Sequence, residues 1–262
     1  MPIKTSGIRK SLVYLWGYSL CSLFIGLLLW EWAVWHWSDG LLPSPIMILR
    51  CLWEQFEQGN ILVHFNASSL RFIFGLFFGM VTGVIVGFCI AMYPFAFYCL
   101  IPWLALLFPI PKIAFFPVLI VFLGVGEASR IMTISIGVFM PSVICAWLGV
   151  RSIPQDLLLM AHSFSLSRWQ IFKGIIFPGS LPYLLLSVRL SITLALILLI
   201  TAEMLGAQTG IGAFILASGS MGLLDQLFAG VLVISVSGLF MVGCLGMLEL
   251  KILHWQRKTR WI

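Results

Sequence analysis

Three charged side chains inside long apolar stretches are the residues of this sequence best placed to do chemistry. Lys112 stands among prolines, where its ammonium could bond to a carbonyl or face an anionic ligand. Arg189 lies eleven residues after Pro178, about 16 Å along a helix and too deep to face lipid. We expect it to point inward and bond broken backbone or a second subunit. Glu203, fourteen residues further on, is predicted to lie at the outer face. It could act there as a gate or a docking contact, or it could be an interfacial residue without a specific role.

A second pair of charges, Glu127 and Arg130, is three positions apart at the start of an apolar run. Residues at this spacing are neighbours on a helix, so we predict a local ion pair worth about 0.2–0.5 kcal/mol. We expect this pair to lie in a solvated loop.

Chemistry on nucleotides or metals is not expected of this chain. It contains no Gly-Lys dipeptide, hence no G-x-x-x-x-G-K-[ST] loop to hold phosphates, and we predict that it is not an enzyme and binds no cofactor. A membrane-embedded enzyme would need a cluster of histidine, acid, serine or metal-ligating residues, and none is evident. No metal site is predicted, because there is no Cys-x-x-Cys pair and the histidines are scattered. The histidines are His36, His64, His162 and His254.

The composition is typical of a protein embedded in lipid. Of its 262 residues, 61% are hydrophobic and 9% are charged, against about 25% charged in a soluble domain. The net charge of +6 does not indicate nucleic acid, because the bases stand at the chain ends and in short loops. We therefore predict an all-α integral membrane fold, one domain over 1–262, with membrane lipid and not nucleic acid as its partner.

Six apolar runs are long enough to cross a membrane. The first follows three bases, as a signal peptide does, but its core is too long and no small-x-small cleavage site follows, so we predict a retained span. The forty uncharged residues between Arg71 and Lys112 would form about 60 Å of helix, twice the ~30 Å hydrocarbon core, and Met92-Tyr93-Pro94 divides them. The predicted spans are 11–32, 70–92, 96–123, 130–150, 180–203 and 226–248.

Prolines interrupt the third predicted span. Each removes a backbone donor, and a helix that faces lipid cannot leave the freed carbonyls unpaired. We therefore predict broken helix there, lining protein or a wet path. The prolines are Pro102, Pro109, Pro111 and Pro117.

The distribution of bases predicts the orientation. Cytoplasmic segments are rich in Lys and Arg, and with six spans ten bases fall on the side that holds both termini. Both termini are therefore expected in the cytoplasm. These bases are Lys4, Arg9, Lys10, Arg151, Arg168, Lys173, Lys251, Arg257, Lys258 and Arg260, and the acids of the opposite side are Asp39, Glu54, Glu57, Glu127, Glu203 and Asp225.

Two segments outside the spans show helical periodicity. Residues 46–58 predict an amphipathic helix on the outer interface, as a membrane anchor or a docking surface. The cytoplasmic loop 151–179 is amphipathic in two pieces. Its second piece opens with Ser167-Arg168-Trp169-Gln170, which has the form of a capping box, and we expect Pro178 to stop that helix.

This loop resembles the signature of permeases of bacterial ABC importers, Glu-Ala-Ala, three residues, Gly, nine residues, Ile-x-Leu-Pro. The matching residues are Leu159-Met160-Ala161, Ser165 and Ile175-Ile176-Phe177-Pro178. Leu159 stands where the family has glutamate, and Ser165 where it has the turn glycine. The resemblance therefore does not decide whether this chain forms the family's ion pair to the ATPase or its unstrained left-handed turn. The resemblance implies an ATPase-coupling loop with these residues: Leu159, Ala161, Ser165, Arg168, Trp169, Phe172, Ile175 and Pro178.

The resemblance covers roughly Leu41 to Trp255 and is to the nitrate, sulfonate and taurine branch of these permeases. It rests on the order and spacing of short strings, among them Leu42-Pro43-Ser44-Pro45, Ser69-Leu70-Arg71, Pro109-Ile110-Pro111-Lys112, Gly124-Val125-Gly126-Glu127, Leu181-Pro182 and Ala202-Glu203-Met204.

What the resemblance implies is a type I importer permease fold of six transmembrane helices in the bacterial inner membrane. It further implies a second permease copy, two ATPase subunits that hold ATP and Mg, and an external solute-binding protein. A docked cytoplasmic helix pair could carry ATPase motion into the spans, with Trp169 and Phe172 as apolar anchors and Arg168 and Lys173 as polar ones. The alternative is a surface helix against the membrane.

Other functions remain open at this point. An ion-gradient-driven secondary transporter would be expected to show paired half-repeats and an acid near mid-membrane, and neither is evident. An assembly factor with degenerate coupling is a further alternative. Lys112 and Arg189 favour a small anion as solute, with a neutral pyrimidine-type solute as the alternative. The permease pair could be a homodimer or include a related chain.

Overall fold

The computed structural model describes residues 6–37 and 42–253, and within them every regular element is a helix. Lys4, Asp39, His254, Arg257, Lys258 and Arg260, which the sequence predictions use, lie outside the described residues. The α-helices are α1 (Ser6–Trp37), α2 (Pro45–Glu57), α3 (Asn60–Met92), α4 (Pro94–Leu107), α5 (Phe116–Leu123), α6 (Glu127–Arg151), α7 (Gln155–Ser163), α8 (Arg168–Ile171), α9 (Phe177–Met204), α10 (Ile211–Ser220) and α11 (Leu224–Ile252). A 3₁₀ turn, η1 (Lys112–Phe115), precedes α5, and a π-helical turn, η2 (Phe172–Ile176), joins α8 to α9.

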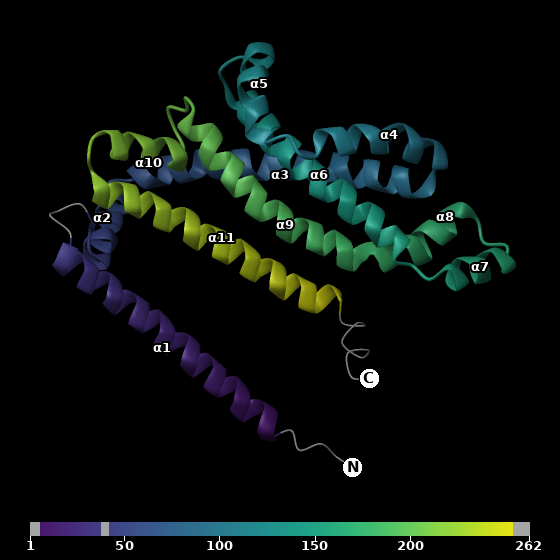
Figure 1. Cartoon of the computed structure of the whole chain (residues 1–262), viewed down its shortest axis with the longest axis horizontal. Helices are drawn as coiled ribbons and strands as arrows, with labels where there is room; N and C mark the ends of the chain where they lie inside the picture. Colours follow the sequence, from purple (N-terminus) through teal and green to yellow (C-terminus); the bar gives the residue numbers. More distant parts are fainter. Residues whose placement is uncertain (1–5, 38–41, 254–262) are drawn as a thin grey trace.

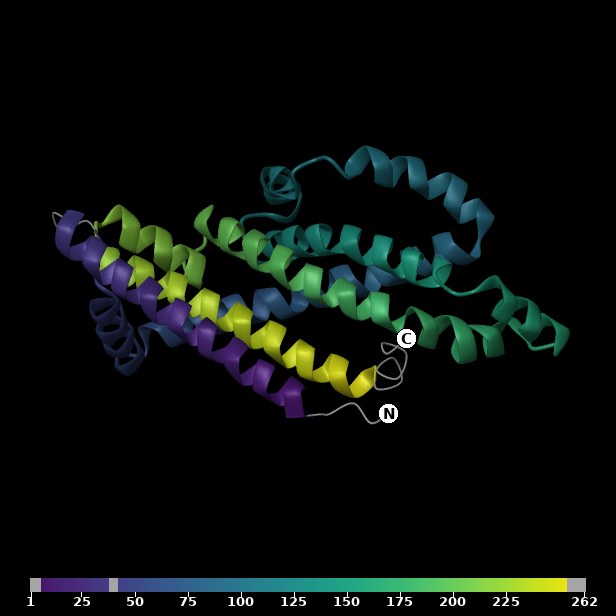
Figure 2. The ribbon, with the colours of Figure 1, turned by 60° about the horizontal axis from the view of Figure 1, so that its bottom comes forward.

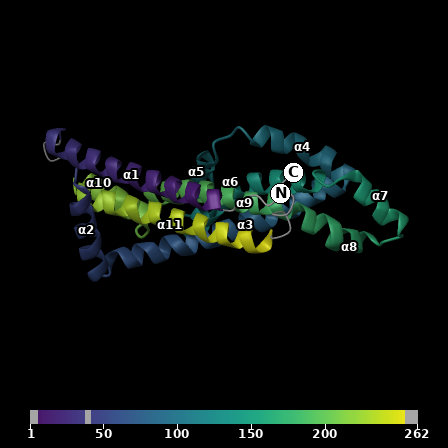
Figure 3. The ribbon, with the colours of Figure 1, turned by 90° about the horizontal axis from the view of Figure 1, so that it is seen from below.

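The long helices lie side by side in an elongated bundle (Figures 1 and 2). Helices α2 and α10 lie at one end, and α7 and α8 project from the other (Figure 3). Four helical segments are long and apolar enough to cross a membrane: α3, α6, the continuous run Arg168–Met204, and α11. A fifth exists if α4 and the η1–α5 segment are one bent span. The apolar part of α1, Cys21–His36, is shorter, so six spans stay a prediction.

A row of glycines brings α3 and α6 into backbone contact. Gly75, Gly79, Gly83 and Gly87 recur every fourth residue and all face α6. A Cβ atom on Gly79 would lie 2.5 Å from the Ser135 carbonyl oxygen, and one on Gly87 would lie 2.5 Å from that of Val143. Small residues at this spacing allow close packing of helices in lipid, where the hydrophobic effect does not hold them together. We call this row the glycine seam.

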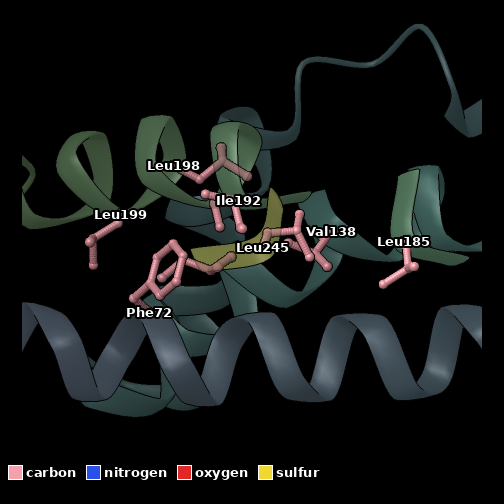
Figure 4. Close-up of a cluster of buried hydrophobic side chains, with 9 residues drawn as sticks. Phe72, Val138, Leu185, Ile192, Leu198, Leu199 and Leu245 are labelled. Carbon is pink, nitrogen blue, oxygen red and sulfur yellow. The ribbon is translucent and has the colours of Figure 1, made fainter. Parts of the chain in front are cut away.

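The buried core lies where α3, α6, α9 and α11 meet. Its side chains come from all four helices, and most gather between them, with Leu185 to one side (Figure 4). The outer surfaces of these helices carry many exposed large apolar side chains, and only 6% of the apolar window of α11 is buried. Such surfaces suit lipid or further subunits. The core residues are Phe72, Ile134, Val138, Leu185, Ile192, Ala195, Leu198, Leu199 and Leu245.

The third predicted span is broken, as the prolines predict. Helix α4 ends at Leu107, and the following segment bends away by 95°. Pro109 and Pro111 lie in this break, where their missing amide hydrogens would otherwise be needed to continue the helix. The residues of the one predicted span therefore form two helices, α4 and α5, with α5 turned out of the bundle (Figure 1).

The loop 151–179, which the sequence predicts to be cytoplasmic, forms the two predicted helices, but the expected stop at Pro178 is wrong. The capping box is present: Ser167 Oγ accepts from the Gln170 N–H, and the Gln170 side chain accepts from the Ser167 N–H. The helix then continues through Pro178 into α9. In the π-helical turn the Phe177 N–H bonds to the Phe172 carbonyl, five residues back. This change of register absorbs a proline whose ring and missing donor would disrupt a regular α-helix.

We predict that Gly83→Leu destabilises the protein because the seam has no room for a side chain. A Cβ atom at Gly83 would lie 2.6 Å from the Phe139 carbonyl oxygen, and such overpacking costs about 1–3 kcal/mol or more. The measurement is the midpoint of thermal unfolding in detergent. The control is Gly243→Leu on α11, where nothing lies within 4 Å of the added Cβ atom. Equal unfolding midpoints for the two variants would contradict this prediction.

Candidate functional site: a buried ion cluster and an exposed helix pair

Arg71 is the centre of an ion cluster at the end of the bundle opposite α7 and α8. Its side chain on α3 is 2% exposed. The Nε and NH2 groups donate to the two Glu127 oxygens over 2.5 and 2.7 Å, a bidentate pairing. The NH1 group donates to Glu203 Oε1 over 2.7 Å and to the Thr209 carbonyl over 2.6 Å. One guanidinium thereby joins α3, α6, α9 and the loop after α9.

Glu203 is the buried acid of this cluster. Ser68 Oγ lies 2.7 and 2.8 Å from its two oxygens, and the Gly212 N–H in the first turn of α10 donates to it over 2.9 Å. The N-terminal end of a helix favours a negative charge. Gly210 closes the loop beside the carboxylate with φ of 134°, and a Cβ atom there would lie 2.5 Å from Glu203 Cδ. Position 210 therefore requires glycine.

Arg130 is the second cation of the cluster. It is 6% exposed, and its NH2 group donates to the Gly206 carbonyl over 2.7 Å. Its NH1 group reaches Glu127 Oε1 at 3.3 Å, and its Nε has no partner. The predicted Glu127–Arg130 pair exists, but the expectation of a solvated loop is wrong for Arg130. Glu127 remains exposed over 60% of its side chain while it bridges two buried arginines.

The central role of Arg71 is absent from the sequence predictions. Its partners lie 56 and 132 positions away along the chain, beyond the reach of any local spacing rule. One signal was available: Arg71 stands four residues before Gly75 and therefore shares the face of α3 that carries the glycine seam. The predicted outer-face position of Glu203 and its role as a gate stay predictions.

Lys112, a predicted pathway residue, caps the broken helix. Its ammonium donates to the carbonyls of Leu107, Phe108 and Ile110 over 2.8–2.9 Å and lies 5.9 Å from the centre of the Phe108 ring. All three ammonium protons have an acceptor, at carbonyls beside the break; Pro111, for instance, has no N–H to donate to the Leu107 carbonyl. This geometry fits the structural alternative. Two largely apolar hollows of about 840 and 660 Å³ share Lys112 in their lining, so a pathway role stays a prediction.

Arg189 pairs with an acid that the sequence predictions do not single out. Its NH2 group donates to Glu249 in the last turn of α11 over 2.6 Å. The arginine side chain is 47% exposed. Within this chain Arg189 therefore bonds a carboxylate and not broken backbone, and it is half exposed where the sequence predicted an inward position; a contact with a second subunit stays a prediction.

The exposed helix pair α7–α8 holds the predicted coupling residues. Leu159 is 65% exposed and Trp169 69%. Beneath them Ala161 is buried, and Phe172 packs edge-on against Phe88 of α3, with ring centroids 5.4 Å apart. Of the remaining residues, Arg168 is exposed, and Ile175 and Pro178 are half-buried.

Ser165 forms the turn between α7 and α8. Its φ is 53°, the only positive φ of a non-glycine residue among those described. The backbone therefore takes the left-handed conformation that the glycine of the family signature would accommodate without steric cost.

These features define a class of protein: a multi-pass membrane protein, helical throughout the residues described, with a helix pair, α7–α8, that projects from one end of its bundle. More particularly, residues 72–254 match the family described as binding-protein-dependent transport system inner membrane component, and the chain belongs to that family. It is therefore a membrane permease component of an ABC importer, a class whose ATPase is a separate subunit.

Two relatives and one solved structure illustrate the likeness. The chain is 29% identical over 228 residues to the taurine transport system permease protein of Escherichia coli, covering 85% of this chain and 83% of that one. It is 28% identical over 235 residues to the nitrate import permease protein of Synechocystis, covering 86% of each. An inward-facing structure of the MetNI methionine ABC transporter matches with a TM-score of 0.63 at 17% identity, over 71% of this chain and 93% of that one. This last match supports the fold, that of a type I importer permease.

We predict that Glu203→Gln destabilises the protein far more than Glu249→Gln does. Two buried arginines, Arg71 and Arg130, share the carboxylates of Glu127 and Glu203, so loss of Glu203 leaves one buried positive charge uncompensated, which costs about 3–5 kcal/mol. Glu249 pairs with a half-exposed arginine, and such pairs contribute about 0–1 kcal/mol. Thermal unfolding in detergent measures both variants. Similar losses in the two would show that the cluster adds no stability beyond a surface pair.

Proposed function

We propose that the chain is the permease subunit of an ATP-driven importer for a small anion such as nitrate, a sulfonate or taurine. In this proposal two permease chains pair, two ATPase subunits supply ATP, Mg and hydrolysis, and an external protein delivers the solute. The observation that carries the proposal is the exposed apolar helix pair α7–α8, continuous with a spanning helix. Family membership and the named relatives support it.

The orientation belongs to this proposal. We place α7 and α8 in the cytoplasm and the Arg71 cluster at the external end. Arg151, Arg168 and Lys173 stand at the α7–α8 end, which the positive-inside rule assigns to the cytoplasm. Helix α1 begins and α11 ends toward that same end (Figures 1 and 3), as two cytoplasmic termini require.

The apolar surface of α7–α8 is the proposed docking site for the ATPase. It is formed by Leu159, Met160, Phe164 and Trp169, each more than half exposed. Leu159 replaces the acid of the family signature, so this contact is apolar here and not ionic. Trp169 stacks on Phe172, whose ring lies 5.6 Å away and is held by the core below. Phe172 supports the docking surface, and Trp169 forms it.

The continuous helix supplies a physical route for coupling. Residues Arg168–Met204 form one run of 37 residues, about 55 Å long at 1.5 Å per residue. A displacement of α8 by a docked ATPase therefore moves a rod, not a flexible loop. That rod carries Glu203 of the ion cluster in its last turn. Motion at one end of the bundle thus reaches the salt bridge at the other.

We predict that Phe164→Ala/Trp169→Ala abolishes association with the ATPase and the ATP hydrolysis of the purified assembly. Both side chains are exposed, so their removal takes away docking area without opening the core. The test is co-purification of the tagged chain from its native membrane, followed by an ATPase assay. The matched control is Trp53→Ala/Phe56→Ala, an exposed Trp–Phe pair on α2 at the far end. A wild-type chain that purifies without an ATPase would refute the ATP-driven function.

We predict that Ser165→Gly stabilises the α7–α8 turn. The left-handed conformation costs an L-residue about 1 kcal/mol, and glycine does not pay that cost. Part of the gain is lost to the greater freedom of glycine in the unfolded chain. The control is Ser163→Gly in the last turn of α7, where glycine weakens a helix. Proteolysis of the loop in the intact protein should slow for the first variant and accelerate for the second. The opposite order would refute strain at Ser165.

A further inference from the structure

Glu127 is the exposed member of a cluster whose other ionised side chains are buried. Both of its oxygens bond to the Nε–NH2 edge of Arg71, the geometry in which arginine binds carboxylates and other oxyanions. It is also the first residue of α6, directly after Gly124-Val125-Gly126. A rotation of this one side chain toward solvent would free the Nε–NH2 edge of Arg71 and the NH1 group of Arg130 from their carboxylate partner.

Without Glu127, the charge balance of the cluster favours the binding of one anion. With Glu127 the two arginines and two glutamates balance. Without it, Arg71 and Arg130 face Glu203 alone, and the site carries one net positive charge. Glu203 cannot take over, because its oxygens are engaged by Arg71, Ser68 and Gly212. A single monovalent anion would restore neutrality, which a low-dielectric site strongly favours.

Arg130 has donor capacity that the carboxylate of Glu127 does not use. Its Nε has no partner although the residue is 94% buried, since 6% is exposed. Its NH1 group has only the 3.3 Å contact to Glu127 Oε1, an oxygen that Arg71 already uses. A carboxylate has two oxygens, and both bond to Arg71. An anion with three oxygens could keep both of those bonds and offer its third oxygen to Arg130.

A hollow lies close to the cluster along α6. Ala128, next to Glu127, lines the hollow of about 840 Å³ whose lining also includes Met132 and Lys112. Residues next to the cluster along α6 therefore line this largely apolar space, although the four charged side chains themselves do not. In the proposed orientation this is the external mouth of the permease.

We propose that Arg71 and Arg130 form an entry site for a monovalent anion with three oxygens, of the sulfonate or nitrate class, and that the Glu127 carboxylate occupies this site until the anion displaces it. This inference rests on the proposed function, whose solute class it narrows and whose first contact in the permease it assigns. Exchange of one carboxylate for one monoanion leaves the cluster neutral throughout. The four helices are then never held around an unpaired buried charge.

The test uses the full-length chain alone, in nanodiscs of phosphatidylcholine at constant chloride concentration. Calorimetric titration with methanesulfonate and with nitrate measures binding, and acetate and neutral dimethyl sulfone are the comparison ligands. In Glu127→Gln the resident charge is gone, and we expect both three-oxygen anions to bind about tenfold more tightly or better than in wild type. Acetate should gain less, and dimethyl sulfone should gain nothing.

Three further variants identify the site. Arg130→Gln added to Glu127→Gln should remove the gain. Glu249→Gln, which frees Arg189 from a similar contact elsewhere, should produce none. Glu127→Asp keeps the charge on a shorter side chain and should give an intermediate gain, so it replaces Glu127→Gln if that variant does not fold. No gain in the Glu127 variants, an equal gain for acetate, or a gain that persists without Arg130 would each overturn the assignment.

The design separates this inference from the proposed function. No ATPase is present in the titration, so failure of anion binding leaves the docking experiment on α7–α8 unaffected. Conversely, the chain could bind methanesulfonate through Arg130 and yet purify from its membrane without an ATPase. That result would support the entry site and refute the ATP-driven mechanism.

Discussion

The pairing of one buried arginine, Arg71, determines how the helices are arranged at one end of this molecule. Arg71 carries a full charge at a place with 2% exposure, and a charge so placed must be paired and hydrogen-bonded or the fold does not hold it. Its partners come from α6, from α9 and from the loop after α9. Helices that lipid alone would leave free to slide are thereby fixed at their ends. Along their lengths, the glycine seam does the same by backbone contact, where no polar group is needed.

These two constraints lie on one face of α3, and together they support the proposed coupling through α9. Helices α3 and α6 are in backbone contact along the seam, from Gly75 to Gly87, where neither can move without the other. Helix α9 meets these two helices through packed side chains and, at its last turn, through the Glu203–Arg71 pair. A force applied at α8 therefore moves a rod against a fixed pair. Such a movement has its largest energetic effect at the ion cluster, because a small displacement there changes the pairing of full charges.

Local rules predicted the parts of this structure that local interactions decide. The capping box at Ser167, the division at Met92-Tyr93-Pro94 and the broken third span depend on a few neighbouring residues. The same rules were wrong at Pro178, because a proline ends a helix only if the backbone cannot change register, and the π-helical turn before it does so. The Arg71 cluster could not be derived, since its pairs join residues that only the packing of four helices brings together. Glu249 was missed as the partner of Arg189 for that reason.

The departures from the family signature illustrate how a fold tolerates an unfavourable residue. Ser165 adopts the left-handed turn at a cost of about 1 kcal/mol, which is small beside the packing that seats α7 and α8 on the core. Geometry is therefore preserved where the signature residue is lost. Leu159 differs, because it is exposed and packing cannot compensate for a missing charge. In the proposed docking its effect depends on the surface that meets it: we propose that the partner ATPase offers an apolar contact there, since a partner that carries a cation for an acid would leave that cation unpaired.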